Sequence, residues 1–219
     1  MRNIVRFFVA ATIASSISWT ASAAVPTACM SDDDREKAIA SCTTVIDSPR
    51  SSKDDLVAAL KQRAMHRSSY GEKDEALADI ERALAFKPND ASLYSLRADT
   101  RGEYDTDAAI TDVSKAIELA PKVSTYRAQR AKLYMGQNDY RAEEDFSEAI
   151  RLDPKNPDRY MERLAYYSER HEFDKAIADA TAQISLGQTQ RLMVRAQLQM
   201  YMQRFSDAMS DLDKLVTST

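Results

Sequence analysis

The feature that most constrains this chain is a short pattern that returns about every 33 residues. In the full copies an alanine is followed by an aspartate, an apolar residue and a second alanine, in the order Ala-x-x-Asp-apolar-x-x-Ala. Three full copies, two weaker ones and a degenerate one at the front begin at Ala76, Ala109, Ala142, Ala176, Ala208 and Ala38. In chain order the leading alanines are separated by 38, 33, 33, 34 and 32 residues. Such a period is typical of stacked repeats, in which each unit buries its apolar face only against its neighbours.

A second pattern, an arginine followed by alanine or leucine, precedes five of these copies. Its members are Arg63-Ala64, Arg97-Ala98, Arg130-Ala131, Arg163-Leu164 and Arg195-Ala196. Apolar residues at helical spacing surround both patterns, so each period predicts two short amphipathic helices. The repeated alanines let the two helix backbones approach closely. The glycines Gly71, Gly136 and Gly187, together with prolines, mark the turns.

One set of residues falls at a spacing that is shared with a known family. It comprises Gly71, Asp74, Ala76, Asp79 and Ala83, closed by Pro88, with Tyr134 and Tyr167 in later copies. On these residues the chain resembles the tetratricopeptide repeat (TPR) family over about residues 56–217. It departs from the family pattern in lacking the tryptophan, in placing Arg67 and Thr100 near where a large residue is usual, and in having no closing proline in the fourth and fifth copies.

The resemblance implies an all-α fold. We expect a right-handed α-solenoid of five TPR helix pairs plus an N-terminal single capping helix at residues 34–47. The repeats are expected at about residues 56–88, 89–121, 122–154, 155–187 and 188–219, after an N-terminal segment at 24–55. Because no further capping helix follows the last pair, we expect its final helix to offer a raw apolar face.

The first 23 residues predict a secretory signal peptide. Arg2 and Arg6 precede the apolar stretch Phe7–Ile17, and Ala21-Ser22-Ala23 forms a small-residue cleavage site. The alternative, a membrane anchor, would need a stretch of about 20 apolar residues. A lipoprotein signal would lipidate Cys29 but lacks the leucine-like residue before it. We therefore expect an exported protein, periplasmic or secreted, with no transmembrane segment after cleavage.

Export changes the interpretation of the two cysteines. In an oxidising compartment an even pair favours a structural disulfide between Cys29 and Cys42, provided that residues 30–33 fold back along the first helix. The alternative is two free thiols. Removal of the signal takes away two arginines, so the net charge falls from −4 to 28 − 34 = −6. An acidic chain has no global basic field, and nucleic acid is not expected as a partner.

Nothing in the sequence predicts an enzyme, a cofactor or a metal site. The regular recurrence of Arg63, Arg97, Arg130, Arg163 and Arg195 with Asp79, Asp112, Asp145, Asp179 and Asp211 predicts structural ion pairs between facing helices. His66 and His171 are isolated and are expected at the surface. Nucleophile elbows, P-loops and dinucleotide fingerprints do not occur in the sequence.

The most informative surface is the one that the resemblance places on the concave side. In the TPR family the first helix of each pair lines this face, and partners lie along it as extended peptides or helices. The candidate partner-binding residues are Lys132, Met135, Met161, Met193, Gln197, Met200 and Tyr201. Flexible thioethers suit surfaces that accept varied apolar partners, although core packing between helices is the alternative. Only Lys61 and Lys132 resemble the Lys/Asn/Arg set with which some family members clamp a C-terminal carboxylate.

Two functions are compatible with these sequence features. The favoured one is a non-enzymatic scaffold or adaptor of the bacterial cell envelope, which binds an unidentified protein partner in its groove. The alternative is a self-assembling structural protein that forms a homodimer through its last helix.

Overall fold

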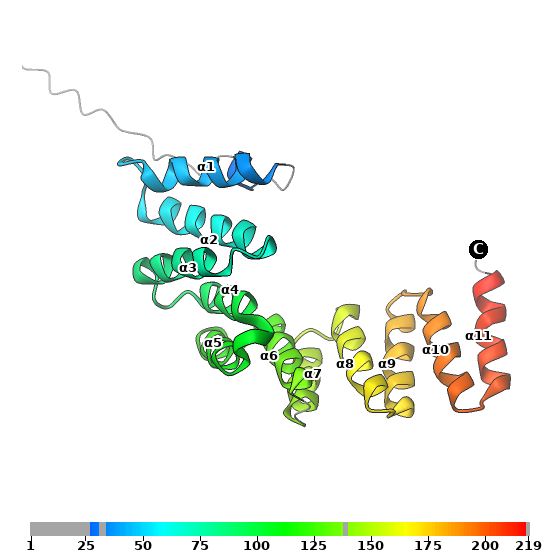
Figure 1. Cartoon of the computed structure of the whole chain (residues 1–219). Helices are drawn as coiled ribbons and strands as arrows, with labels where there is room; N and C mark the ends of the chain where they lie inside the picture. The colour runs from blue at the N-terminus through cyan, green and yellow to red at the C-terminus, as the bar shows by residue number, and fades with distance from the viewer. Residues whose placement is uncertain (1–26, 31–33, 138–139, 218–219) are drawn as a thin grey trace, which may run out of the picture.

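The computed structural model describes residues 27–30, 34–137 and 140–217, and the regular secondary structure of this part of the chain is all helical, without strands (Figure 1). The elements are η1 (Thr27–Met30), α1 (Arg35–Asp47), α2 (Lys53–Ser69), α3 (Lys73–Phe86), α4 (Ala91–Arg101), η2 (Gly102–Asp105), α5 (Thr106–Leu119), α6 (Ser124–Gly136), α7 (Arg141–Leu152), α8 (Pro157–Glu169), α9 (Phe173–Ser185), α10 (Arg191–Tyr201) and α11 (Phe205–Thr217). The expected signal peptide at residues 1–23 lies outside the described residues.

Local sequence signals set the helix ends. Asp34 accepts a hydrogen bond from the backbone N–H of Lys37, and Ser52 forms a capping box with Asp55 at the start of α2. The first helix therefore begins close to the expected residue 34, whereas α2 begins at Lys53, slightly before the expected boundary at 56. After α8 and after α10 the chain turns through a residue that has the left-handed backbone conformation but is not glycine. These residues are His171, with a φ of 57°, and Gln203, with a φ of 59°.

Consecutive helices pack in pairs, α2 with α3, α4 with α5, α6 with α7, α8 with α9 and α10 with α11. The pairs follow one another along an arc, which confirms the expected all-α solenoid (Figure 1). The alanines of the repeated pattern are at most 2% exposed, as illustrated by Ala76, Ala109, Ala142, Ala176 and Ala208. Small side chains at these positions allow the helix backbones to approach closely.

The first helices lie on the inner side of the arc. Successive first helices contact each other, α2 with α4 and α6 with α8. A hollow of about 260 Å³ is lined by side chains of α4, α6 and α8 alone, including Ser95, Gln129 and Glu162. The solenoid therefore presents a groove whose wall consists of first helices.

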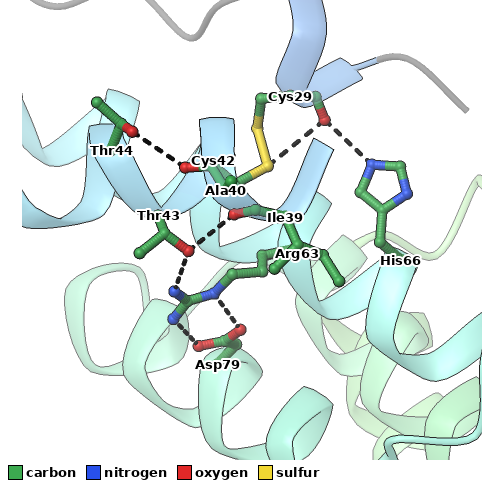
Figure 2. The surroundings of a disulfide bond; sticks show 9 residues. All are labelled: Cys29, Ile39, Ala40, Cys42, Thr43, Thr44, Arg63, His66 and Asp79. Carbon is green, nitrogen blue, oxygen red and sulfur yellow. Dashed lines mark hydrogen bonds and ion pairs between the residues drawn. A yellow bond between two sulfur atoms is a disulfide. The ribbon is translucent and has the colours of Figure 1, made fainter. Parts of the chain in front are cut away.

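A disulfide-bound turn completes the N-terminal end of the solenoid (Figure 2). Cys29 in η1 is bonded to Cys42 in α1, and both cysteines are fully buried. The turn η1 contacts α1 and α2, and these are the two neighbours that the first helix of a preceding repeat would have. The turn therefore takes the place of that helix, and α1 is the single capping helix.

One inter-repeat contact differs from the others. Gln183 in α9 stands at the position that Ala83, Ala116 and Ala149 occupy in earlier repeats, and it is 1% exposed. Its Nε2 atom, and the Oε1 atom of the buried Gln199 in α10, have no hydrogen-bond partner among the described residues. A buried polar group without a partner costs about 1–3 kcal/mol. The contact between α9 and α10 therefore buries two side-chain amide atoms without partners, where the alanines of the earlier repeats bury none.

Candidate protein-interaction groove

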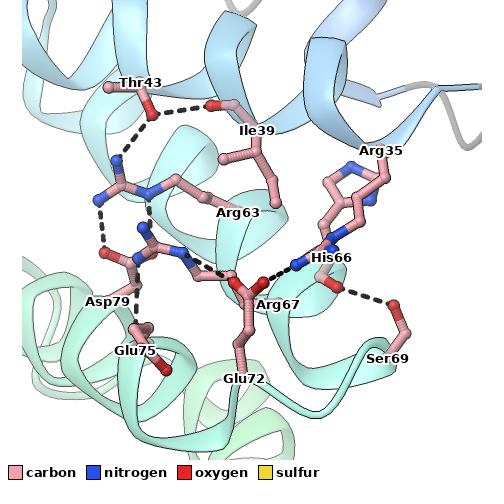
Figure 3. Close-up of polar contacts among 10 residues, drawn as sticks. All are labelled: Arg35, Ile39, Thr43, Arg63, His66, Arg67, Ser69, Glu72, Glu75 and Asp79. Carbon is pink, nitrogen blue, oxygen red and sulfur yellow. Dashed lines mark hydrogen bonds and ion pairs between the residues drawn. The ribbon is translucent and has the colours of Figure 1, made fainter.

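A buried arginine–aspartate pair joins the two helices of each repeat. Arg63 donates from Nε and Nη2 to the two carboxylate oxygens of Asp79, at 2.8 and 2.6 Å (Figure 3). The same two-pronged geometry links Arg97 to Asp112, Arg130 to Asp145, Arg163 to Asp179 and Arg195 to Asp211. The five aspartates are only 2–3% exposed. A pair repeated in every unit supports the architecture, because a reaction needs one such site rather than five.

Four of these arginines also bind a hydroxyl group on the preceding repeat or on α1. Arg63 donates from Nη1 to Thr43 Oγ1 at 2.9 Å, so that it joins α1, α2 and α3 (Figures 2 and 3). Equivalent bonds of 2.9–3.0 Å reach Ser114, Ser147 and Thr181. The repeat pattern alone did not point to these hydroxyls, although each of these three lies two residues after the aspartate of its repeat. Each arginine thus ties neighbouring units together.

In the first three repeats the buried carboxylate receives a second guanidinium. Arg67, Arg101 and Arg127 donate to Asp79, Asp112 and Asp145 at 2.7, 2.5 and 3.0 Å. Hydrogen bonding to the aspartate is the main reason why the pKa of Arg97 and of Arg130 lies above its usual range. These contacts occupy the aspartate carboxylates within the fold and leave little of them for a ligand.

His66 is not at the surface as expected from the sequence. It is 6% exposed, and its Nε2 atom lies 3.1 Å from the backbone oxygen of Cys29 (Figure 2). The ring is buried because η1 folds over α2, a contact between segments 37 residues apart that helical spacing does not reveal. His66 therefore belongs to the N-terminal cap, whereas His171 is exposed at the left-handed end of α8.

The candidate partner-binding residues divide into a core member and surface members. Met135 packs, half-buried, against the cluster that contains Phe146. By contrast, the exposed fractions of Met161, Met193, Met200 and Tyr201 are 36, 43, 51 and 77%. Three of the four candidate methionines are therefore available at the surface.

The exposed residues gather on α8 and α10. Gln197, Met200 and Tyr201 line a hollow of about 440 Å³, and the Tyr201 ring stacks on Phe173 with ring centres 5.8 Å apart. Lys132 on α6 is exposed and forms an ion pair of 2.6 Å with Glu162 on α8. The C-terminal part of the groove wall thus combines thioethers, an aromatic ring and charged groups. We name Met161, Met193, Gln197, Met200 and Tyr201 the methionine strip.

The N-terminal part of the groove is polar and largely paired. Lys61 donates to Ser92 at 2.8 Å, and Gln129 bridges Ser95 and Asp99 through its side-chain amide. The surrounding groove walls partly exclude water from the Asp99 carboxyl, although its side chain is exposed, and this desolvation raises its pKa. The hydrogen bond from Gln129 acts in the opposite direction and lowers the pKa. These side chains already bind one another, so the methionine strip is the better candidate for a docking surface.

The described residues contain no group of three or more histidine, cysteine, aspartate or glutamate side chains arranged to hold a metal ion. Among the helices that the structure describes, none has the length and apolar character to cross a membrane.

Comparison with known structures defines the class of fold. No protein-family model matches the sequence, and no curated protein matches it. Solved structures do match the fold, and they show that the chain has the fold of TPR proteins.

Three of these structures illustrate the match. A tetratricopeptide repeat protein from Parabacteroides merdae has a TM-score of 0.63 and 21% sequence identity, with 84% of this chain and 73% of that chain covered. MamA from Desulfovibrio magneticus has a TM-score of 0.61 and 14% identity over 76% of this chain and 96% of that chain. YrrB, described as a TPR protein with an unusual peptide-binding site, has a TM-score of 0.57 and 16% identity over 80% of this chain and 91% of that chain.

Proposed function

We propose that this protein is a non-enzymatic scaffold or adaptor of the bacterial cell envelope that holds a peptide or helix of another exported protein in its groove. The observation that carries the proposal is the methionine strip. Apolar side chains on the inner wall of a solenoid remain accessible to a ligand, and thioethers adapt to varied partners. The peptide-binding site named for YrrB supports the same use of this fold.

The proposed location rests on the N-terminal residues. The signal-like sequence at 1–23 and the disulfide between Cys29 and Cys42 together support an exported chain, because disulfides persist in oxidising compartments. Mass spectrometry of the protein from its own compartment should find an N-terminus near Ala24 and no free thiol. An intact Met1, or two cysteines that react with iodoacetamide without reductant, would contradict the proposal.

Site-specific crosslinking tests the proposed groove. A photo-crosslinking amino acid at Gln197, which lines the hollow on α10, should capture a partner in the native compartment. The same group at Glu81, exposed on the second helix α3, should not.

Two substitutions should then abolish this capture. Met161→Glu combined with Met193→Glu places charge in the methionine strip and is expected to weaken binding by ~2 kcal/mol or more. The matched changes Glu81→Lys and Lys115→Glu on second helices should have little effect. The thermal midpoint is measured alongside, so that loss of binding counts only in a folded protein. Normal capture by a folded double variant would show that the groove assignment is wrong.

A homodimer is the second candidate, supported by exposed apolar residues on α11. Phe205 and Met209 are 60 and 58% exposed on this helix. Burial of such side chains between two copies would stabilise a two-fold dimer. Leu212→Glu should then convert a dimer to a helical monomer in light scattering. A monomeric unmodified protein would remove this candidate.

A further inference from the structure

Arg191, at the start of α10, is a cation without an anionic partner in the described structure. Its Nη2 atom lies 2.9 Å from the thioether sulfur of Met161, which is only a weak acceptor. Its Nε atom is buried and has no hydrogen-bond partner among the described residues. A partly desolvated guanidinium in this state would gain strongly from a carboxylate. Arg191 therefore differs from the five arginines that hold the repeats together.

The charges around Arg191 do not supply that carboxylate. On the adjoining inner surface, Lys132 and Arg159 share the single carboxylate of Glu162, each at 2.6 Å. With Arg191 this part of the groove holds three cations, against the carboxylates of Glu162 and of Asp99, and Asp99 lines the same hollow as Lys132 and is hydrogen-bonded to Gln129. The chain as a whole carries a net charge of −4, so the cations on this surface stand out against an acidic molecule. Charge complementarity favours an acidic partner here.

The methionine strip begins beside Arg191, and its length sets the spacing between the two points at which a bound segment would make contact. Met161 contacts Arg191 directly, while Met200 lies nine residues further along α10 and lines the hollow with Gln197 and Tyr201. At 1.5 Å per residue of helix, nine residues correspond to about 13 Å. An extended peptide covers this distance in about four residues. A carboxylate on Arg191 and an apolar side chain in the hollow would therefore be about four residues apart.

We propose that the α8–α10 part of the groove binds an acidic segment of a partner protein in extended form. A carboxylate of the segment pairs with Arg191, and an apolar side chain about four residues away enters the hollow at Gln197, Met200 and Tyr201. This inference rests on the proposed function and specifies the chemistry of the partner. The apolar contact supplies affinity, and the ion pair selects acidic sequences over neutral or basic ones.

A display library of random 12-residue peptides is the probe. It is selected separately on the mature wild-type protein and on Arg191→Glu, and individual winners are measured by fluorescence anisotropy. Wild-type selection should enrich Asp or Glu about four residues from a large apolar residue. These peptides should bind Arg191→Glu at least tenfold more weakly, whereas selection on that variant should enrich Lys or Arg at the same spacing. Arg82→Glu, an exposed charge reversal on α3, is the matched control and should bind as wild type does.

The outcomes separate this inference from the proposed function. Selected peptides that lack acidic residues, or that bind Arg191→Glu as tightly as wild type, overturn the assignment of Arg191. The groove function still stands in that case if Met193→Glu abolishes the binding of these peptides. Winners that are insensitive to both substitutions overturn the groove function as well. If selection enriches nothing and light scattering shows a dimer, a second copy occupies this surface and the acidic-segment proposal is wrong. Circular dichroism of Arg191→Glu and of the neutral Arg191→Gln verifies that a loss of binding is not a loss of fold.

Discussion

The disulfide should stabilise only the N-terminal cap, and the size of this effect follows from the loop that it closes. Cys29 and Cys42 are 13 residues apart, and closing a loop of this length stabilises the structure by about 3 kcal/mol. Among the described elements the turn η1 packs mainly against α1 and α2, so this energy acts on the end of the solenoid. Reduction should therefore accelerate amide exchange in α1 by about two orders of magnitude. Exchange in α6 and α7 should be unchanged, because repeat stability is set by nearest neighbours.

Hydrogen exchange with mass spectrometry, with and without reductant, measures both effects in one experiment. The double variant Cys29→Ala with Cys42→Ala gives the same comparison without relying on the entry of reductant to a fully buried bond. The oxidised wild type under identical denaturant is the control. If α1 exchanges at the same rate after the bond is lost, then packing rather than the crosslink holds the cap. If all repeats loosen equally, the assumption of local stability is wrong.

Three further predictions concern the repeats. Asp145→Ala leaves Arg130 with no carboxylate and should cost about 3–5 kcal/mol in urea unfolding, whereas Glu148→Ala, which removes a more exposed pair, should cost under about 1 kcal/mol. Gln203→Gly relieves the left-handed backbone at φ 59° and should raise the thermal midpoint by about 2–4 °C; no change would show that this residue is unstrained. Burial is the main cause, and the hydrogen bond to Glu143 the second cause, that raises the pKa of Tyr167 to about 12. The neutral hydroxyl therefore contributes to the free energy of unfolding below pH 10, and this contribution is lost between about pH 10 and 12. Tyr167→Phe should lose less stability than wild type over that interval, and equal losses would contradict the shift.

The sequence alone predicted the parts of the fold that depend on periodicity. The spacing of alanine, aspartate and arginine located the helix pairs, and the structure places Arg63 against Asp79 as that spacing indicated. Contacts that depend on how far a side chain reaches were missed. Helical spacing cannot show that Arg63 also extends to Thr43, nor that Met135 turns towards the core while Met161 is exposed.

The burial of His66 was missed for a different reason. It depends on a turn outside the repeats, and the position of that turn is fixed by a disulfide rather than by a periodic pattern. The sequence also could not predict which charged groups in the groove are already paired. Arg191 resembles any other surface arginine in the sequence, and only the geometry shows that the nearby Glu162 is already occupied by Lys132 and Arg159.

Between α9 and α10, one amide atom of Gln183 and one of Gln199 have no hydrogen-bond partner in the described structure, and this has a consequence for how the contact can open. Separation of the two helices exposes Gln183 and Gln199 to water, which satisfies their amide groups and offsets part of the apolar area lost. At the position of Gln183 the earlier repeats have alanine, whose side chain has no polar group to hydrate when the contact opens. We therefore expect this joint to open at a lower polar cost than the others, with α10 and α11 moving together because they pack against each other as a pair. Because α8 lies on one side of this joint and α10 on the other, the same motion widens or narrows the space beside Met161, so that one groove can close around segments of different thickness.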